Sequence, residues 1–178
     1  MFDTFKARAE AVSAKVYRFA GKAEAIRFIL AFLAEEGVSD APGAHAVWSS
    51  CRFLDGLDRI KIAEDSGVRF DVTRELAATA KVGISQADRA IANTGTLAFV
   101  ATPVDGRLVS SLPMVHVAIV ATRSIVPDLP AFLREVSPAD HAYLSLITGP
   151  SRTADIERVL TIGVHGPERL IIVFVDDL

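Results

Sequence analysis

The chain has 178 residues, of which 51% are hydrophobic, and its mean hydropathy is +0.35. A chain of this length can bury about 70% of the surface that it exposes when unfolded, so we expect one domain spanning residues 1–178. The formal net charge is −3, from 19 basic and 22 acidic residues, and no basic cluster or aromatic-basic interleaving occurs. These features argue against a nucleic-acid-binding protein.

Cys51 is the only cysteine of the chain. One thiol cannot form an intramolecular disulfide, a four-thiolate zinc site or an iron–sulfur cluster that normally needs four thiolates. We therefore expect no cofactor bound by this chain alone, and any such cluster must come from a partner protein. Cys51 is more typical of a small packing residue than of a nucleophile, because its neighbour Phe53 is apolar and no histidine lies nearby.

The sequence shows neither a signal peptide nor a membrane span. Charged residues interrupt residues 1–21 throughout, so no continuous apolar segment of a signal peptide is present. The longest purely apolar run, residues 170–175, is far shorter than the ~20 residues that a membrane-spanning helix requires. We expect a cytoplasmic protein.

Two helical patterns open the chain. Apolar residues at steps of three and four predict an amphipathic helix over residues 1–20. The same spacing recurs over residues 23–33, and Gly37 follows where a helix commonly ends in a left-handed residue. Short apolar runs then predict strands at residues 46–48, 68–70, 82–84, 97–101 and 115–120, with helical patterns between several of them. This alternation is typical of an α/β sandwich.

A polar stretch separates the strands predicted at residues 82–84 and 97–101. Within it, Ala87, Ala90 and Ile91 predict one or two helical turns. Thr94, Gly95 and Thr96 then precede the second strand and have two interpretations. They are typical of a turn in which Gly95 supplies a positive φ, and their hydroxyl and backbone groups could also donate hydrogen bonds to a small oxygenated ligand.

The stretch from residue 144 to residue 175 predicts a strand, a loop, a helix, a second loop and a second strand. Ser151 or Thr153 can cap the helix, which we expect to continue through Ile156 and Leu160. Backbone amides of residues 149–153 would then face outward and bind a carboxylate or phosphate, with Gly149 and Arg152 completing an anion loop. The alternative is that the two hydroxyls only cap their own helix and Arg152 is solvated.

The histidines and the missing motifs narrow the chemistry further. His116 interrupts an apolar strand and is typical of a hydrogen-bonded core residue, whereas His165, in a glycine-rich loop, is the better candidate for catalysis. The sequence contains no dinucleotide fingerprint, Walker loop, zinc-protease helix or nucleophile elbow. No group of residues has metal-ligand spacing, so we predict no metal site.

Four stretches carry a family resemblance: GISQADRAIANTGT, SSLPMVHVAIV, ITGPSRTADIE and GVHGP. In this order they resemble the LUD-domain family, and the match covers about residues 81–175. The resemblance implies a fold similar to that of sugar-phosphate isomerases and CoA transferases of the NagB/RpiA type. The family commonly has an acidic residue where this chain has Asn93, so no acid–base role is carried over to that position.

We therefore predict a three-layer α/β/α sandwich with a mostly parallel sheet of about six strands. Two functions remain open. The resemblance implies an accessory or catalytic subunit of a system that oxidises L-lactate to pyruvate, with iron–sulfur proteins as partners. The alternative is a free-standing enzyme or binding module for a small phosphorylated or carboxylated metabolite. The sequence leaves open whether the chain forms a homo-oligomer.

Overall fold

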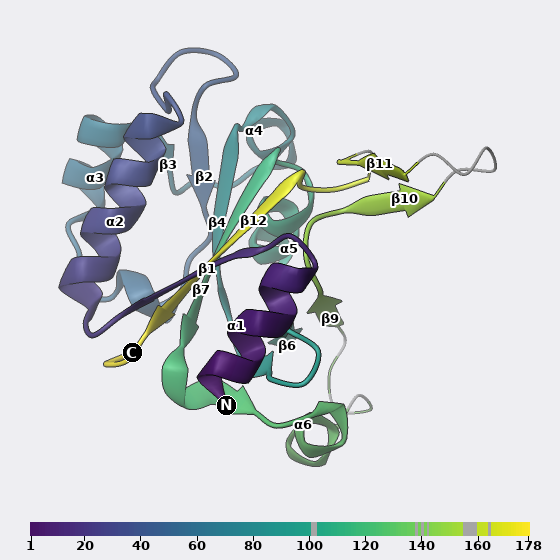
Figure 1. Cartoon of the computed structure of the whole chain (residues 1–178). Helices are drawn as coiled ribbons and strands as arrows, with labels where there is room; N and C mark the ends of the chain where they lie inside the picture. The colour runs from purple at the N-terminus through teal and green to yellow at the C-terminus, as the bar shows by residue number, and fades with distance from the viewer. Residues whose placement is uncertain (101–102, 138, 140, 142, 155–159, 164) are drawn as a thin grey trace.

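The computed structural model describes residues 1–100, 103–137, 139, 141, 143–154, 160–163 and 165–178 (Figure 1). Its centre is a six-stranded sheet in the order β1-β12-β7-β4-β2-β3, in which all neighbouring strands are parallel. The strands are β1 (Lys15–Phe19), β2 (Ala46–Trp48), β3 (Val68–Arg69), β4 (Val82–Ala87), β7 (Val115–Ala121) and β12 (Arg169–Val175). Both β7 and β12 are almost wholly buried and nearly continuous in apolar residues, as strands covered on two faces must be.

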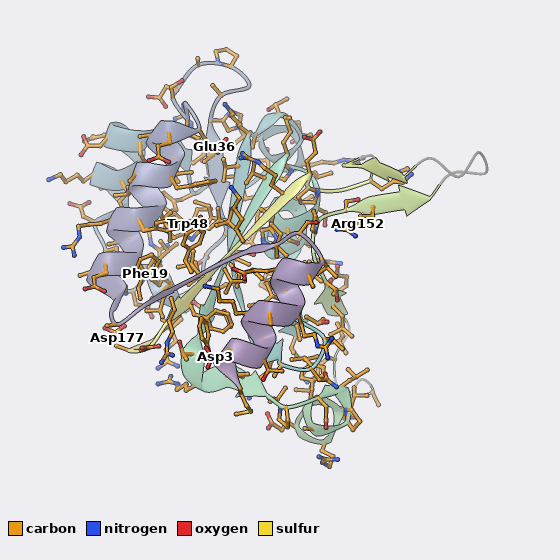
Figure 2. All side chains as sticks on the ribbon, viewed as in Figure 1. Asp3, Phe19, Glu36, Trp48, Arg152 and Asp177 are labelled. Carbon is orange, nitrogen blue, oxygen red and sulfur yellow. The ribbon has the colours of Figure 1, made fainter. Side chains whose placement is uncertain are left out.

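Helices cover both faces of this sheet (Figure 1). The helices of the described residues are α1 (Phe2–Ala11), α2 (Lys22–Glu35), η1 (Arg52–Leu54), α3 (Arg59–Ser66), α4 (Arg74–Thr79), α5 (Val104–Ser111), η2 (Thr122–Ser124) and α6 (Leu129–Glu135). The apolar faces of α2 and α3 pack on one side around the fully buried Trp48 (Figure 2). The opposite side is covered by α1, α4 and α5. The predicted α/β sandwich with a mostly parallel sheet is confirmed.

A second sheet, which the sequence did not predict, packs beside α1 on the same face. It has the order β8-β5-β6-β9 and contains β5 (Arg89–Ile91), β6 (Thr96–Val100), β8 (Ile125–Val126) and β9 (Leu144–Ile147). The helical turns expected at residues 87–91 are therefore wrong. The Asp88 amide donates to the Ala98 carbonyl and β5 pairs with β6, so hydrogen bonds to the next strand override the local helical spacing.

The helix predicted over residues 1–20 is also wrong beyond Ala11. Ser13 has a φ of +72°, in the left-handed region, and this residue ends the helical path. Residues 15–19 continue as β1, in which Val16 is buried against the core and pairs with Ile172. The apolar spacing runs on past the true helix end because an inward-facing strand residue falls, by coincidence, on the helical stripe.

The helix expected after Ser151 is replaced by an antiparallel hairpin of β10 (Arg152–Ala154) and β11 (Leu160–Ile162). Ile156 lies outside the described residues. Thr161 and Ile162 are β-branched and favour strand, and the Ser151 carbonyl accepts from the Gly163 amide at 3.1 Å. The hairpin projects from the body of the molecule in Figure 1. Ser151 therefore lies at the base of a hairpin and not at the start of a helix.

Candidate functional site

Sequence-predicted site residues gather around one cavity of about 340 Å³, which we call the amino-end cavity. It lies beside the amino ends of β7 and β12 and is bounded by β9 on its other side. Its lining comprises residues 110–111, 116, 145–152, 165–167 and 170. Gly149, Ser151, Arg152 and His165 are therefore brought together with segments that begin at residue 110 and end at residue 170, 60 positions apart in sequence.

The loop at Ser151 is held by backbone hydrogen bonds. The Ser151 amide donates to the Pro167 carbonyl at 2.8 Å, so it does not point outward from a helix as the anion-loop prediction required. Gly166 lies directly against this loop, and a Cβ added there would stand 3.1 Å from Cβ of Ser151. The donors that remain for a ligand are consequently side chains and not the Ser151 amide.

Arg152 and Gly149 fasten the same loop to the end of α1. One Arg152 guanidinium nitrogen donates to the Val12 carbonyl at 3.0 Å and to Oγ of Ser13 at 2.7 Å. Gly149 has a φ of +71°, and a Cβ there would stand 2.6 Å from the Val12 carbonyl oxygen. Figure 2 shows Arg152 at the base of the hairpin, beside this end of α1. Thr153 belongs to β10.

Thr94 and Gly95 lie in the turn between β5 and β6, Thr96 begins β6, and none of the three lines the cavity. Gly95 has a φ of +68°, and its amide donates to the Ile91 carbonyl at 3.0 Å. Oγ1 of Thr96 lies 2.7 Å from Oγ1 of Thr94 and 2.7 Å from Oγ1 of Thr148, a cavity-lining residue. This turn therefore reaches the cavity through Thr148, and its role in ligand binding stays a prediction.

His116 forms part of the cavity wall and is 1% exposed. Its Nε2 lies 2.8 Å from Oγ of the buried Ser85, which confirms the predicted hydrogen-bonded core histidine. Burial lowers the pKa of His116 to about 3, so the imidazole is neutral near pH 7. Among the described residues its Nδ1 has no hydrogen-bond partner. The Nδ1 atom of His116 is therefore a buried hydrogen-bonding atom beside the cavity that has no partner among the described residues.

A second cavity, of about 370 Å³, was not found from the sequence. We call it the switch-point cleft; its polar lining includes Ser50, Arg52, Gln86, Asp88, Asp105 and Arg123. Gln86 lies near the carboxyl end of β4, and Asp105 lies in the first turn of α5. The others follow the carboxyl ends of β2, β4 and β7. Polar residues directly after apolar runs could have indicated this cleft. The sequence does not reveal which strands are neighbours, however, so it does not show that these residues meet.

Other chemistries receive little support from the described part of the chain. No group of three or more His, Cys, Asp or Glu side chains there is arranged to hold a metal ion. Burial raises the pKa of the Cys51 thiol, which disfavours the thiolate that a nucleophile or metal ligand needs. No helix in the same residues has the length and apolar character needed to cross a bilayer.

The fold and the two cavities define a doubly wound α/β protein with room for small ligands. The family model of the LUD domain matches residues 2–175, a wider range than the four sequence motifs covered. The chain belongs to the LUD-domain family.

Its relatives include proteins named lactate utilization protein C. The one from Exiguobacterium sp. (strain ATCC BAA-1283 / AT1b) is 39% identical over 114 residues, which cover 61% of this chain and 50% of the relative. The one from Macrococcus caseolyticus (strain JCSC5402) is 38% identical over 147 residues, 76% of this chain and 62% of the relative. The chain thus spans about half to three fifths of these relatives' length.

A solved structure of a DUF162 family protein from Deinococcus radiodurans has a similar fold. The TM-score is 0.65 and the sequences are 18% identical, with 98% of this chain and 95% of the other covered. The whole described architecture therefore recurs in a distant protein.

Proposed function

We propose that the chain binds a small carboxylate, lactate or pyruvate, in the amino-end cavity and acts in lactate utilisation. One observation carries this proposal: all four motifs of the family resemblance meet at this cavity. The motifs around His116, Ser151 and His165 line it directly. The motif that contains Ser85 and Thr96 reaches it through hydrogen bonds to His116 and Thr148.

The cavity offers the chemistry that a hydroxy or oxo acid needs. The Arg152 guanidinium can attract and hydrogen-bond a carboxylate, and Thr148, Ser145 and Ser151 bring hydroxyls that either donate or accept. His165 is exposed in its glycine-rich loop and remains our candidate for proton transfer. The names of the relatives favour lactate or pyruvate among small carboxylates.

Iron–sulfur partner proteins are the second part of the proposal. Oxidation of lactate to pyruvate removes two electrons, and a chain with one cysteine lacks the thiolates for a cluster of its own. The chain would hold and orient the carboxylate while partners accept the electrons. Growth on L-lactate as sole carbon source tests this role: deletion of the gene should impair growth, and complementation should restore it.

Titration calorimetry with lactate and pyruvate tests the site. Arg152→Ala should weaken binding of the carboxylate by roughly 1.5–3 kcal/mol, the scale of a hydrogen bond to a charged group. Ser13→Ala is the matched control, because it removes one contact of Arg152 to the end of α1 and leaves the guanidinium in place. Equal affinity of both variants for each carboxylate would show that Arg152 only fastens the loop.

The same titration, extended to sugar phosphates, distinguishes the alternative function from the proposed one. A free-standing module for phosphorylated metabolites should prefer a sugar phosphate to lactate and pyruvate. Such a preference, combined with normal growth of the deletion strain on L-lactate, would replace our proposal by that alternative.

A further inference from the structure

The connections of the central sheet reverse direction between β2 and β4. From β2 the chain passes through α3 on one face to the edge strand β3. From β4 it passes through β5, β6 and then α5, on the other face, to β7. In open α/β sheets, ligands bind outside the carboxyl ends of the strands at such a reversal, because the two connections diverge and leave a crevice. The switch-point cleft occupies this position.

Side chains in this cleft are already fixed by hydrogen bonds to the backbone of separate segments. Asp105 accepts from the Ser50 amide at 3.2 Å, and Oε1 of Gln86 accepts from the Phe53 amide at 2.8 Å. Oδ2 of Asp88 accepts from the Val100 amide at 2.8 Å. The loop that follows β2 is therefore tied to β4 and α5, and the residue that follows β4 is tied to β6, which lowers the ordering cost of binding.

The charged side chains of the cleft indicate which ligands it can bind. Arg89 is paired with Glu135, but Arg52 and Arg123 form no ion pair with any described residue. Guanidinium groups of this kind match carboxylate and phosphate oxygens. Burial raises the pKa of Asp88, whereas the hydrogen bond from the Val100 amide favours the ionised carboxylate. The carboxylate only accepts hydrogen bonds, so a ligand group that faces it must be a donor.

We propose that the switch-point cleft is a second binding site, for a small metabolite that carries both an oxyanion and a hydroxyl group. Arg52 and Arg123 bind the oxyanion, and Asp88 accepts from the hydroxyl. This site lies at the carboxyl ends of the strands, whereas the amino-end cavity lies at the opposite ends, so the proposal does not depend on lactate binding.

Three probes test the proposal by calorimetry on the full chain: glycerol 3-phosphate, methyl phosphate and glycerol. The first should bind more tightly than the other two, because it alone has both groups. Arg123→Ala should weaken the binding of both phosphates about 10- to 100-fold, the factor expected for a lost hydrogen bond to a charged group. Arg27→Ala, an exposed arginine on α2, is the control and should change nothing.

Asp88→Ala should remove the advantage of glycerol 3-phosphate over methyl phosphate while methyl phosphate still binds, which shows that the fold is intact. Amide NMR shifts locate the site: glycerol 3-phosphate should shift Ser50 and Gln86 but not Thr148 and His165. The proposal is overturned if no probe binds at millimolar concentration, if shifts occur only at the amino-end cavity, or if Arg123→Ala binds as the unmodified chain does.

Discussion

Ser85 and His116 lie between the two cavities, with Ser85 on the wall of the switch-point cleft and His116 on that of the amino-end cavity. Both side chains are at most 2% exposed, and each is the other's partner at 2.8 Å. Because neither can turn to water, the bond between them fixes the orientation of the imidazole ring.

Ser85→Ala should destabilise the protein by about 1–3 kcal/mol, because it leaves Nε2 of His116 buried without a partner. Urea unfolding measures the change. Ser66→Ala is the control: its hydroxyl only donates to the Ile62 carbonyl within α3, and its loss should cost less than half as much. If the two variants lose equal stability, the buried pair has no special role.

The pH dependence of stability should reveal the same histidine. The folded-state pKa of His116 is about 3, below its ordinary value of 6.5. As the pH falls below 6.5, His116 becomes protonated in the unfolded chain, whereas in the folded protein it stays neutral down to about pH 3. Stability is therefore full above pH 6.5 and is lost by up to about 1.4 kcal/mol per pH unit in that window.

His116→Gln supplies the comparison, since glutamine can still hydrogen-bond Ser85 but does not titrate. Its free energy of unfolding, measured from pH 7 to pH 4, should fall less steeply than that of the unmodified chain. Parallel slopes for the two proteins would mean that other groups cause the acid sensitivity.

At the scale of elements, α1 is held against the site by two glycines. A Cβ on Gly95 would stand 2.4 Å from the Ala9 amide nitrogen, and one on Gly149 would meet the Val12 carbonyl. Both glycines have positive φ and belong to motifs of the family resemblance. These motifs thus serve partly to let the chain pass close beneath α1.

Gly95→Ala should destabilise the protein more than Gly56→Ala in thermal or urea unfolding. Both glycines are left-handed, so each alanine costs about 1–2 kcal/mol from its backbone conformation alone. Gly56 has open space around it, whereas alanine at residue 95 must also displace α1. The two substitutions would have the same effect if the contact with α1 were unimportant.

The elements also show how far the sequence could be interpreted. Buried strands such as β7 and β12 were predictable because continuous apolar runs bounded by turn residues have few other uses. The second sheet was not, because β5 and β8 are short and the pairs β5–β8 and β6–β9 join strands far apart in the chain. The β10–β11 hairpin was not, because each of its strands has only three residues. GPSR and HGP, which we predicted to lie at a site, both line the amino-end cavity, but the helix expected after Ser151 gave GPSR the wrong backbone geometry.

The whole molecule places two cavities at opposite ends of one parallel sheet. In our account, lactate oxidation needs partners that accept electrons. Affinity purification of the tagged chain from cells grown on L-lactate should recover proteins that contain iron–sulfur clusters, and the same purification from cells grown without lactate is the control. Recovery of no such protein after chemical cross-linking would count against the partner assignment.

The central claim is that the amino-end cavity holds a small carboxylate, and amide NMR spectra of the full chain titrated with pyruvate test it most directly. We predict saturable shifts at Thr148, Ser151, His165 and Gly166, which are reduced in Arg152→Ala and retained in Ser13→Ala. Shifts confined to residues outside this cavity, or no shifts at millimolar pyruvate and lactate, would contradict the account.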